Sequence, residues 1–250
     1  IYAIRSVGVN VVIVHGGGPA INQELTSKGI QWEFIDGQRK TTLEMMEVIE
    51  MTLCGLVNRR IVKALNSVGV RAAGLSGVDA GTLVCKQSNV KLGQVGAIEK
   101  VNTALIDAMM GLRVESGIRA VPVISPIGFG KSGEAFNINA DWAAVNIAIA
   151  MGITKVLFLT DQDGILNKEK TLIPQLDAGD LENLIETGVV SGGMLAKTQT
   201  IIHALKNKVT DIHILNARRP HGLIEELFTD QGVGTVCRLR SRSSDVGANV

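Results

Sequence analysis

Short apolar runs rich in β-branched residues alternate along this chain with longer stretches of helical periodicity. The apolar runs predict buried strands at 9–14, 70–75, 81–86, 120–124, 154–160, 211–215 and 234–239. The periodic stretches predict helices at 41–67, 102–117, 140–151, 180–187, 194–206 and 220–229, with one more opened by Pro19. This alternation predicts an α/β fold, a three-layer α-β-α sandwich with a mainly parallel central sheet.

Two lobes are expected, divided near residue 150. Residues 1–150 form the N-terminal lobe and residues 151–240 the C-terminal lobe. Residues 241–250 are polar and rich in Gly and Ser, so we expect a disordered tail. Caps are predicted at Thr41 or Thr42 and at Asn102, because these side chains can accept hydrogen bonds from a first helical turn.

Composition narrows the function classes. Lys and Arg number 25 and Asp and Glu 24, so no field of one sign attracts nucleic acid or an anionic membrane. No apolar run approaches membrane-spanning length. Cys54, Cys85 and Cys237 are odd in number and widely spaced, which indicates a reducing compartment and no metal site. Many of the 28 glycines lie at the ends of apolar runs, where α/β enzymes place phosphate-facing turns.

The first candidate site is His15-Gly16-Gly17-Gly18-Pro19, between a strand and a helix. Glycines let backbone N–H groups approach an anion closely, and a helix N-terminus adds positive potential. No Lys-Ser/Thr pair follows the glycines, so this is not a Walker A loop. By itself the motif fits either a phosphate site or a plain tight turn.

A second candidate is Asn137-Ile138-Asn139-Ala140-Asp141. In an extended segment, alternation places Asn137, Asn139 and Asp141 on one side. Two amides and a carboxylate could hold an amino-acid-like substrate. Equally, Asp141 could only cap the next helix.

Two further motifs begin at strand or helix ends. Thr160-Asp161-Gln162-Asp163-Gly164 ends an apolar strand, where open α/β sheets bind ligands. Ser191-Gly192-Gly193-Met194 precedes a helix that carries Lys197 one turn in, so an ammonium group lies beside an anion-binding backbone. The alternatives are a strand-ending turn and a solvent-facing lysine.

The loop Gly37-Gln38-Arg39-Lys40-Thr41 offers a guanidinium that could grip a carboxylate, or a surface basic pair. The segment 221–235 contains His221 and Glu225, which are neighbours on one helix face. Its apolar residues also fit an amphipathic helix packed on the core.

In their order and spacing these motifs resemble the N-acetylglutamate kinases of the amino-acid kinase family, over about residues 8–240. The family has a strand-ending HGGG loop, a loop arginine and the motifs N-x-N-A-D, T-D-x-x-G-[IV]-L and G-G-M-x-x-K, and all five occur here. The resemblance implies a carbamate kinase-like fold. It also implies transfer of the γ-phosphoryl of ATP, bound with Mg²⁺, to the side-chain carboxylate of N-acetyl-L-glutamate in arginine biosynthesis.

The resemblance implies roles for individual residues. In the N-terminal lobe, Gly17 and Gly18 are expected to contact the γ-phosphoryl and the substrate. Arg39, Asn137 and its neighbour Asn139 are expected to bind the carboxylates and acetamido group of N-acetylglutamate.

The remaining roles concern catalysis and ATP. Lys197 is expected to stabilise the transition state and Asp141 to orient the catalytic lysines, with Gly17 beside the moving phosphoryl. The expected ATP site lies in the C-terminal lobe and consists of Asp161, Gln162, Asp163, Gly164, Ile165, Leu166, Val189, Val190 and Ser191. A carboxylate is already nucleophilic at neutral pH, so positioning and charge neutralisation suffice.

The resemblance also bears on assembly and regulation. A homodimer formed through the N-terminal lobe, or a hexamer of dimers, is implied. Residues 221–235 resemble the C-terminal signature of arginine-inhibited members, which places His221 and Glu226 near a site for L-arginine. A cytoplasmic protein is implied, or one in an organelle stroma or matrix after removal of a transit peptide.

Two departures from the family pattern stand out. The family's first strand carries a Lys-x-Gly-Gly motif whose lysine helps bind the phosphoryl, and this sequence starts after that strand. We therefore expect an N-terminally truncated sequence. Gln38 and Lys40 flank Arg39 where the family usually has apolar residues, which bears on substrate identity.

Two other functions compete with this interpretation. Residues 54–60 and 74–77 resemble relatives that phosphorylate carrier-bound aminoadipate, a different carboxylate. The missing lysine motif is compatible with a non-catalytic module that binds arginine or a nucleotide. A Rossmann dehydrogenase is disfavoured because Gly16-Gly17-Gly18 lacks the G-x-G-x-x-G spacing.

Overall fold

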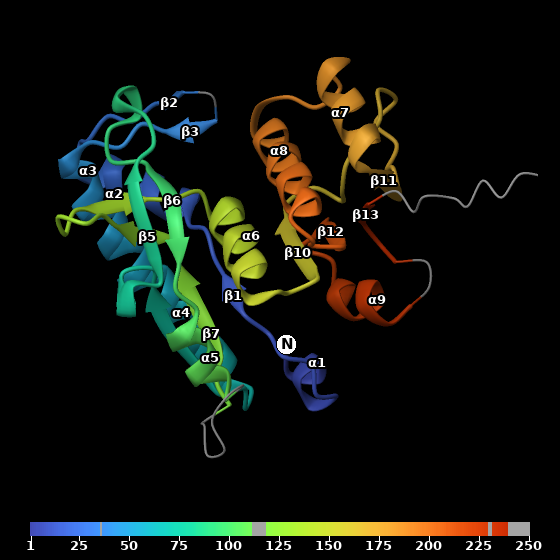
Figure 1. The fold of residues 1–250 in the computed structure, drawn as a ribbon, viewed down its shortest axis with the longest axis horizontal. Coiled ribbons are helices and arrows are strands. Elements are labelled where there is room, and N and C mark those ends of the chain that lie inside the picture. The colour runs from blue at the N-terminus through green and yellow to red at the C-terminus, as the bar shows by residue number, and fades with distance from the viewer. Residues whose placement is uncertain (36, 112–118, 230–231, 240–250) are drawn as a thin grey trace, which may run out of the picture. The chain divides into compact units, whose positions relative to one another are not determined.

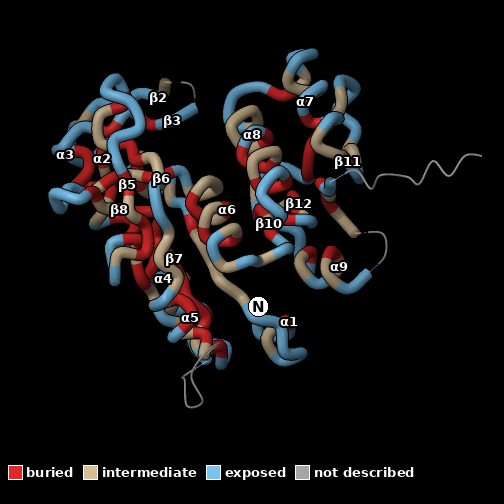
Figure 2. Tube along the Cα trace, in the orientation of Figure 1, coloured by how far each residue is buried: buried red, intermediate tan, exposed pale blue. Residues whose placement is uncertain are grey.

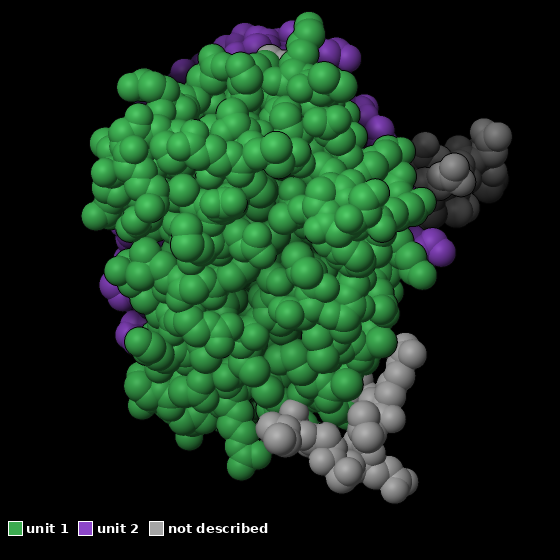
Figure 3. Space-filling view, turned by 90° about the vertical axis from the view of Figure 1, so that its left-hand side faces the viewer, with its two compact units in different colours: residues 1–151 green, residues 152–250 purple. Residues whose placement is uncertain are grey.

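The computed structural model describes residues 1–35, 37–111, 119–229 and 232–239. The chain divides into two compact units, Ile1–Met151 (unit 1) and Gly152–Val250 (unit 2), coloured separately in Figure 3. The expected tail at 241–250 and the end of the helix expected at 102–117 lie outside the described residues. The assignment of acceptor binding to one lobe and ATP binding to the other stays a prediction.

A parallel sheet with the order β1 (Ile13–Val14), β7 (Val121–Ser125), β4 (Ala72–Ser76) lies at the centre of unit 1. Every residue of β7 is buried (Figure 2), as expected for a parallel strand covered on both faces. The strand predicted at 9–14 is shorter than expected, because only its last two residues pair with β7. Its carboxyl end leads directly into the glycine turn.

Unit 1 contains two further sheets that the sequence pattern did not predict as such. One is mixed, with the order β6 (Gly96–Val101), β5 (Leu83–Gln87), β8 (Ile127–Phe129), β9 (Ala135–Asn137). The other is a hairpin of β2 (Phe34–Ile35) and β3 (Gln38–Arg39). These strands are short, and tertiary pairing decides them more than local propensity.

The helices of unit 1 follow the sequence pattern closely. They are α1 (Tyr2–Ser6), α2 (Gly18–Ser27), α3 (Leu43–Glu50), α4 (Asn58–Ser67), α5 (Ala104–Met110) and α6 (Ala140–Met151), with short 3₁₀ turns at Asp79–Gly81 and Val90–Leu92 (Figure 1). Thr42 caps α3 by accepting a hydrogen bond from Met45 N at 3.2 Å. The expected cap of α5 is shifted, because Thr103 holds the cap position while Asn102 accepts from Ala104 N.

The helical stretch predicted at 41–67 is confirmed, but its middle is a π-helix, η1 (Met51–Val57), joining α3 to α4. There the backbone N–H of Asn58 donates to the carbonyl of Leu53, five residues earlier. Short π segments are rare and frequently mark functional sites. This one turns Leu53 toward Gly17.

Unit 2 contains a sheet with the order β10 (Lys155–Thr160), β12 (Asp211–Asn216), β13 (Thr235–Arg238), β11 (Gln175–Asp177). Strands β10 and β12 run parallel, so their carboxyl ends meet at one edge. The helices are α7 (Ala178–Glu186), α8 (Gly192–Lys206) and α9 (Gly222–Phe228), with α8 lying along β10 and β12 in Figure 1. The predicted α/β class with mainly parallel sheets is confirmed. No helix within the described ranges is long and apolar enough to cross a membrane.

Candidate functional site

A cavity of about 180 Å³ in unit 1 is lined by residues from six separate stretches of the chain. Five residues predicted to bind substrate line it, namely Gly17, Gly18, Arg39, Asn137 and Asn139. Other lining residues were not predicted, namely Ile21, Phe34, Gln38, Leu53, Val95, Pro126 and Ile138. The cavity brings glycine backbone, a guanidinium and two amides to one place, which is a set suited to an anionic ligand.

The glycine turn forms one wall of this cavity. Gly17 is the N-cap of α2, whose ten residues point their N-terminus at the turn. A Cβ on Gly17 would lie 2.5 Å from Leu53 Cδ2, closer than real Cβ atoms approach a neighbour. Gly18 has no such neighbour within 4 Å among the described atoms. Packing therefore requires glycine at position 17 but not at 18.

We expect Gly17→Ala to reduce turnover at least tenfold, because the new methyl group displaces either the turn or Leu53. Gly55→Ala is the matched control, since Gly55 lies on η1 and no described atom would approach its Cβ within 4 Å. Circular dichroism should show both variants folded, and steady-state kinetics should separate them. Equal turnover in the two variants would contradict this account.

Arg39 is nearly inaccessible to solvent, with an exposed fraction of 7%. Its guanidinium lies between two aromatic rings, 5.0 Å from the Trp32 centroid and 4.7 Å from the Phe34 centroid. Nη2 donates to Asn22 Oδ1, whereas the buried Nη1 has no hydrogen-bond partner in the described part of the chain. Burial lowers the pKa of Arg39. A buried donor without an acceptor is costly, and a ligand carboxylate would satisfy it.

The alternative of a surface basic pair is wrong for Arg39. Lys40 is the surface residue, and its ammonium group meets the carboxylate of Glu33 at 2.8 Å. The hairpin β2–β3 turns the two neighbouring cations in opposite directions.

The two asparagines are held by hydrogen bonds at the end of β9. Asn137 Nδ2 donates to Thr41 Oγ1 at 3.1 Å. Asn139 Oδ1 accepts from Trp142 N at 3.0 Å and so caps α6. Asp141 lies inside the first turn of α6, so the alternative that it caps this helix is wrong. Because α6 begins at Ala140, Asp141 is helical and does not continue the extended alternation of Asn137 and Asn139. Asp141 does not belong to the residues that line the cavity.

In unit 2 the predicted ATP-binding residues follow β10 at the edge where β10 and β12 end. Asp161 and Asp163 are exposed, and Asp163 Oδ1 accepts from Asn216 Nδ2, at the end of β12, at 2.9 Å. Gly164 has φ +157°, and a Cβ there would lie 2.4 Å from Thr235 Oγ1. Ile165 N donates to the same hydroxyl at 2.9 Å, which fixes the turn.

The N-terminus of α8 is the second helix end with a glycine pair. Ser191 holds the cap position and is exposed, and its side chain makes no capping hydrogen bond within the described chain. Lys197 lies on the second turn of α8, half-buried, with Nζ 4.5 Å from the Phe158 ring centroid. The aromatic face restrains the lysine without neutralising its charge.

No group of three or more His, Cys, Asp or Glu side chains within the described residues could hold a metal ion.

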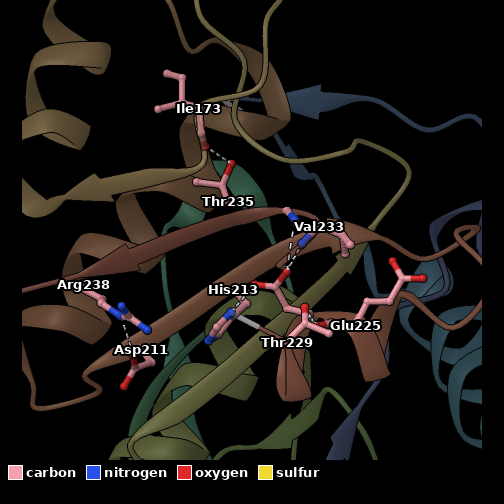
Figure 4. A network of polar contacts seen from close by, with 10 residues as sticks. Ile173, Asp211, His213, Glu225, Thr229, Val233, Thr235 and Arg238 are labelled. Carbon is pink, nitrogen blue, oxygen red and sulfur yellow. Dashed lines mark hydrogen bonds and ion pairs between the residues drawn. The ribbon is translucent and has the colours of Figure 1, made fainter. Parts of the chain in front are cut away.

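The predicted regulatory residues differ sharply in environment. His221 is exposed at the N-cap of α9, in a left-handed conformation with φ 60°. Glu226 is buried, and its Oε1 lies 2.5 Å from Nδ1 of His213. Figure 4 labels His213 and Val233, two of the residues in this polar network. The Oε2 of Glu226 accepts from the backbone N–H groups of Val233 and Gly234. Burial alone would raise the pKa of Glu226, but these hydrogen bonds together hold it below its ordinary value.

We expect Glu226→Gln to lower the free energy of unfolding by about 2 kcal/mol, because a buried acceptor becomes a mismatched donor. Glu225→Gln is the control; its carboxylate meets Arg219 at the surface and should contribute less than about 0.5 kcal/mol. The contribution of Glu226 to the free energy of unfolding should be fully present above its ordinary pKa of 4.5. It should be lost as the pH falls through the lower pKa that Glu226 has in the folded state. Urea titrations of both variants at several pH values measure these free energies of unfolding. Equal unfolding midpoints for Glu226→Gln and Glu225→Gln would contradict the prediction.

Trp32, Phe34, Asn22 and Leu53 are the site residues that sequence reasoning missed. Trp32 and Phe34 did leave a signal, because they alternate just before Arg39 in a chain with only 3% aromatic residues. Asn22 and Leu53 left none, since their approach to the site depends on how α2 and η1 pack.

This arrangement of glycine turns, parallel strand ends and helix N-termini indicates the class of protein to which the chain belongs. The chain belongs to the amino acid kinase family, whose characteristic sequence matches residues 1–216. The resemblance expected from the motifs is thus confirmed.

Individual relatives narrow this class. Acetylglutamate kinase of Ruegeria pomeroyi is 42% identical over 235 residues, covering 94% of this chain and 80% of that protein. Acetylglutamate kinase of a second Ruegeria strain, TM1040, is 43% identical with the same coverage. The solved structure of smu.665 from Streptococcus mutans covers 96% of this chain and 90% of its own, with a TM-score of 0.83 at 23% identity, and shows the same fold.

Proposed function

We propose that this chain is an acetylglutamate kinase of arginine biosynthesis, transferring the γ-phosphoryl of ATP to the side-chain carboxylate of N-acetyl-L-glutamate. The observation that carries the proposal is the cavity of unit 1, where the unpartnered, buried Nη1 of Arg39 joins the glycine turn and Asn137. The relatives named acetylglutamate kinase support the same assignment.

The reaction needs no protein nucleophile and no general base. A carboxylate oxygen of the acceptor attacks the γ-phosphorus, the bond to the β,γ-bridging oxygen breaks, and ADP leaves with that electron pair. The backbone N–H groups at Gly17 and Gly18, together with Lys197, stabilise charge on the moving phosphoryl. Arg39, Asn137 and Asn139 hold the acceptor, and Asp141 orients the lysine.

ATP enters with Mg²⁺ as part of the substrate. The residues proposed to bind it are the turn Asp161–Leu166 and the segment Val189–Ser191. Exposed carboxylates at the carboxyl ends of parallel strands support this placement.

The test combines two assays of one incubation with MgATP and N-acetyl-L-glutamate. A coupled assay measures ADP, and hydroxylamine traps the acyl phosphate as a hydroxamate. Both products are expected in equal amounts. ADP release without hydroxamate would contradict transfer to a carboxylate.

Carrier-bound aminoadipate is the alternative acceptor. Gln38 lines the cavity beside Arg39, so the rim is more polar than the family pattern. Preferred turnover of aminoadipate in the same assay would replace N-acetylglutamate as the substrate. Binding of nucleotide or arginine with no acyl phosphate from either acceptor would favour a regulatory module.

We further propose a cytoplasmic homodimer, or hexamer of dimers, inhibited by L-arginine near His221 and Glu226. The support is the resemblance of residues 221–235 to the signature of arginine-inhibited members. Because Glu226 already binds His213 and two backbone N–H groups, its part would be to shape residues 232–235, leaving the exposed His221 for the ligand. Inhibition by L-arginine but not L-lysine, lost in His221→Ala, is the expected result.

A further inference from the structure

A closed network of polar side chains lies directly behind the glycine turn. His15 Nδ1 lies 2.9 Å from the carbonyl oxygen of Gly16. Its Nε2 lies 3.1 Å from Ser125 Oγ and 3.2 Å from Asn58 Nδ2. All three residues are buried; His15 directly follows β1, Asn58 begins α4 and Ser125 ends β7. The network is therefore a product of the tertiary structure.

The partners fix the protonation state of His15. The Asn58 amide cannot be flipped, because its Oδ1 accepts from Arg59 Nη2 at 2.8 Å and its Nδ2 donates to the Val123 carbonyl at 2.8 Å. Its Nδ2 must then also donate to His15 Nε2, which is an acceptor. A carbonyl can only accept, so His15 Nδ1–H donates to Gly16. His15 is thus the neutral tautomer with its proton on Nδ1.

The same network is joined to the packing of Gly17. The single proton of Ser125 Oγ can serve either His15 Nε2, at 3.1 Å, or the carbonyl of Leu53, at 3.3 Å, and this carbonyl also accepts from Asn58 N in the π-helix. The Leu53 side chain packs against Gly17. On β4, Gly74 leaves the space for Asn58, since a Cβ there would lie 1.8 Å from Asn58 Oδ1. Both the carbonyl of Gly16 and the packing surface of Gly17 thus depend on the same set of contacts.

We propose that His15, Asn58 and Ser125 are positioning residues, which hold the turn 16–18 in the shape that presents its N–H groups to the phosphoryl. This inference rests on the proposed function for its kinetic consequences. None of the three lines the cavity, so they act through the glycines.

A specific pH dependence follows. Protonation of Nε2 would set two donors, His15 and Asn58, against each other and leave Ser125 Oγ as the acceptor of the new proton, and burial lowers the pKa of His15 below 6.5. The Cys54 thiol bonds to Ser125, and burial raises the pKa of this thiol, with the acids Glu50 and Asp79 adding to that shift. Asp141 follows Ala140, whose Cβ would lie 3.7 Å from a Cβ on Gly16. Turnover should therefore fall below the pKa of His15 as the turn loses its support.

Three variants separate positioning from folding. His15→Leu removes the hydrogen bonds of both ring nitrogens and should lower kcat roughly 30-fold, at about 1 kcal/mol for the hydrogen bond of each nitrogen, with the KM for acetylglutamate changed less than about threefold. His15→Gln keeps an acceptor near the Nε2 position, should recover about fivefold, and should lose the acidic fall in rate. Ser67→Ala, exposed on α4, is the control and should match the parent. A kcat for His15→Leu equal to the parent's, or an acidic limb retained in His15→Gln, would overturn the proposal.

A second measurement does not depend on catalysis. Long-range ¹H–¹⁵N spectra of the parent should show His15 protonated on Nδ1 only at pH 7, and the amide resonances of Gly16, Gly17 and Gly18 should shift in His15→Leu. A proton on Nε2, or unmoved glycine resonances, would overturn the network whatever the activity. If the parent forms no acyl phosphate while these spectra behave as expected, the proposed function fails and the positioning of the turn stands.

Discussion

Replacing Arg39 with leucine is expected to weaken the binding of N-acetyl-L-glutamate roughly 150-fold. Truncating one partner of a buried charged pair costs about 3 kcal/mol, and in the proposed function the variant leaves the substrate carboxylate unpaired in the cavity. Leucine should still pack between Trp32 and Phe34, whose rings now enclose the guanidinium. The loss should therefore lie in binding and not in folding.

The geometry of the guanidinium should matter as well as its charge. Arg39→Lys keeps the charge but loses the planar fork that satisfies Asn22 and a carboxylate together, so an intermediate loss of roughly 30-fold is expected. Lys40→Gln is the matched control, since it removes the adjacent cation, which pairs with Glu33 at the surface. Calorimetric titration measures all three variants, with thermal unfolding as the check on folding. An unchanged Kd in Arg39→Leu would remove Arg39 from the acceptor site.

Replacing Lys197 with alanine is expected to lower kcat roughly 1,000-fold and to leave nucleotide binding nearly unchanged. In the proposed function the interaction of this ammonium group strengthens as negative charge develops on the moving phosphoryl, so its loss is expected to fall on the transition state. Phe158 restrains the lysine by a cation–π contact, and Gly192-Gly193 at the start of α8 place backbone N–H groups on the same helix end. Positive potential from the helix and charge from the side chain therefore act in one place.

Lys206→Ala provides the control for this prediction. Lys206 is exposed in the last turn of α8 and pairs with Glu182 at 2.8 Å, so its removal deletes a cation from the same helix. Its kcat should match that of the parent. Single-turnover kinetics and equilibrium binding of ADP separate chemistry from affinity. If Lys197→Ala kept full kcat, or lost nucleotide binding instead, the transition-state role would be wrong.

The two predictions test different units of the chain. Arg39 lies in unit 1 and Lys197 in unit 2. A loss confined to acetylglutamate binding in one variant and to kcat in the other would support the division between acceptor lobe and ATP lobe, which the sequence predicts. Loss of both properties in both variants would argue against that division.

The sequence by itself determined the fold class, most helices and the identity of the motifs. Apolar runs at 120–124, 154–160 and 211–215 became β7, β10 and β12, because parallel strands buried on both faces require uninterrupted apolar residues. The helix predicted at 140–151 is α6. Glycine spacing and the order of five motifs were enough to indicate the family.

Tertiary structure alone decided which motifs meet and what supports them. The hairpin that buries Arg39 between two aromatic rings depends on strands of two residues, too short for periodicity to reveal. The π-helix at 51–57 looks helical in the sequence, yet it sets both the Leu53 side chain against Gly17 and its carbonyl within reach of Ser125. Local patterns encode which residues face a core, whereas hydrogen bonds between residues 43 and 110 positions apart arise only once the sheet brings those residues together.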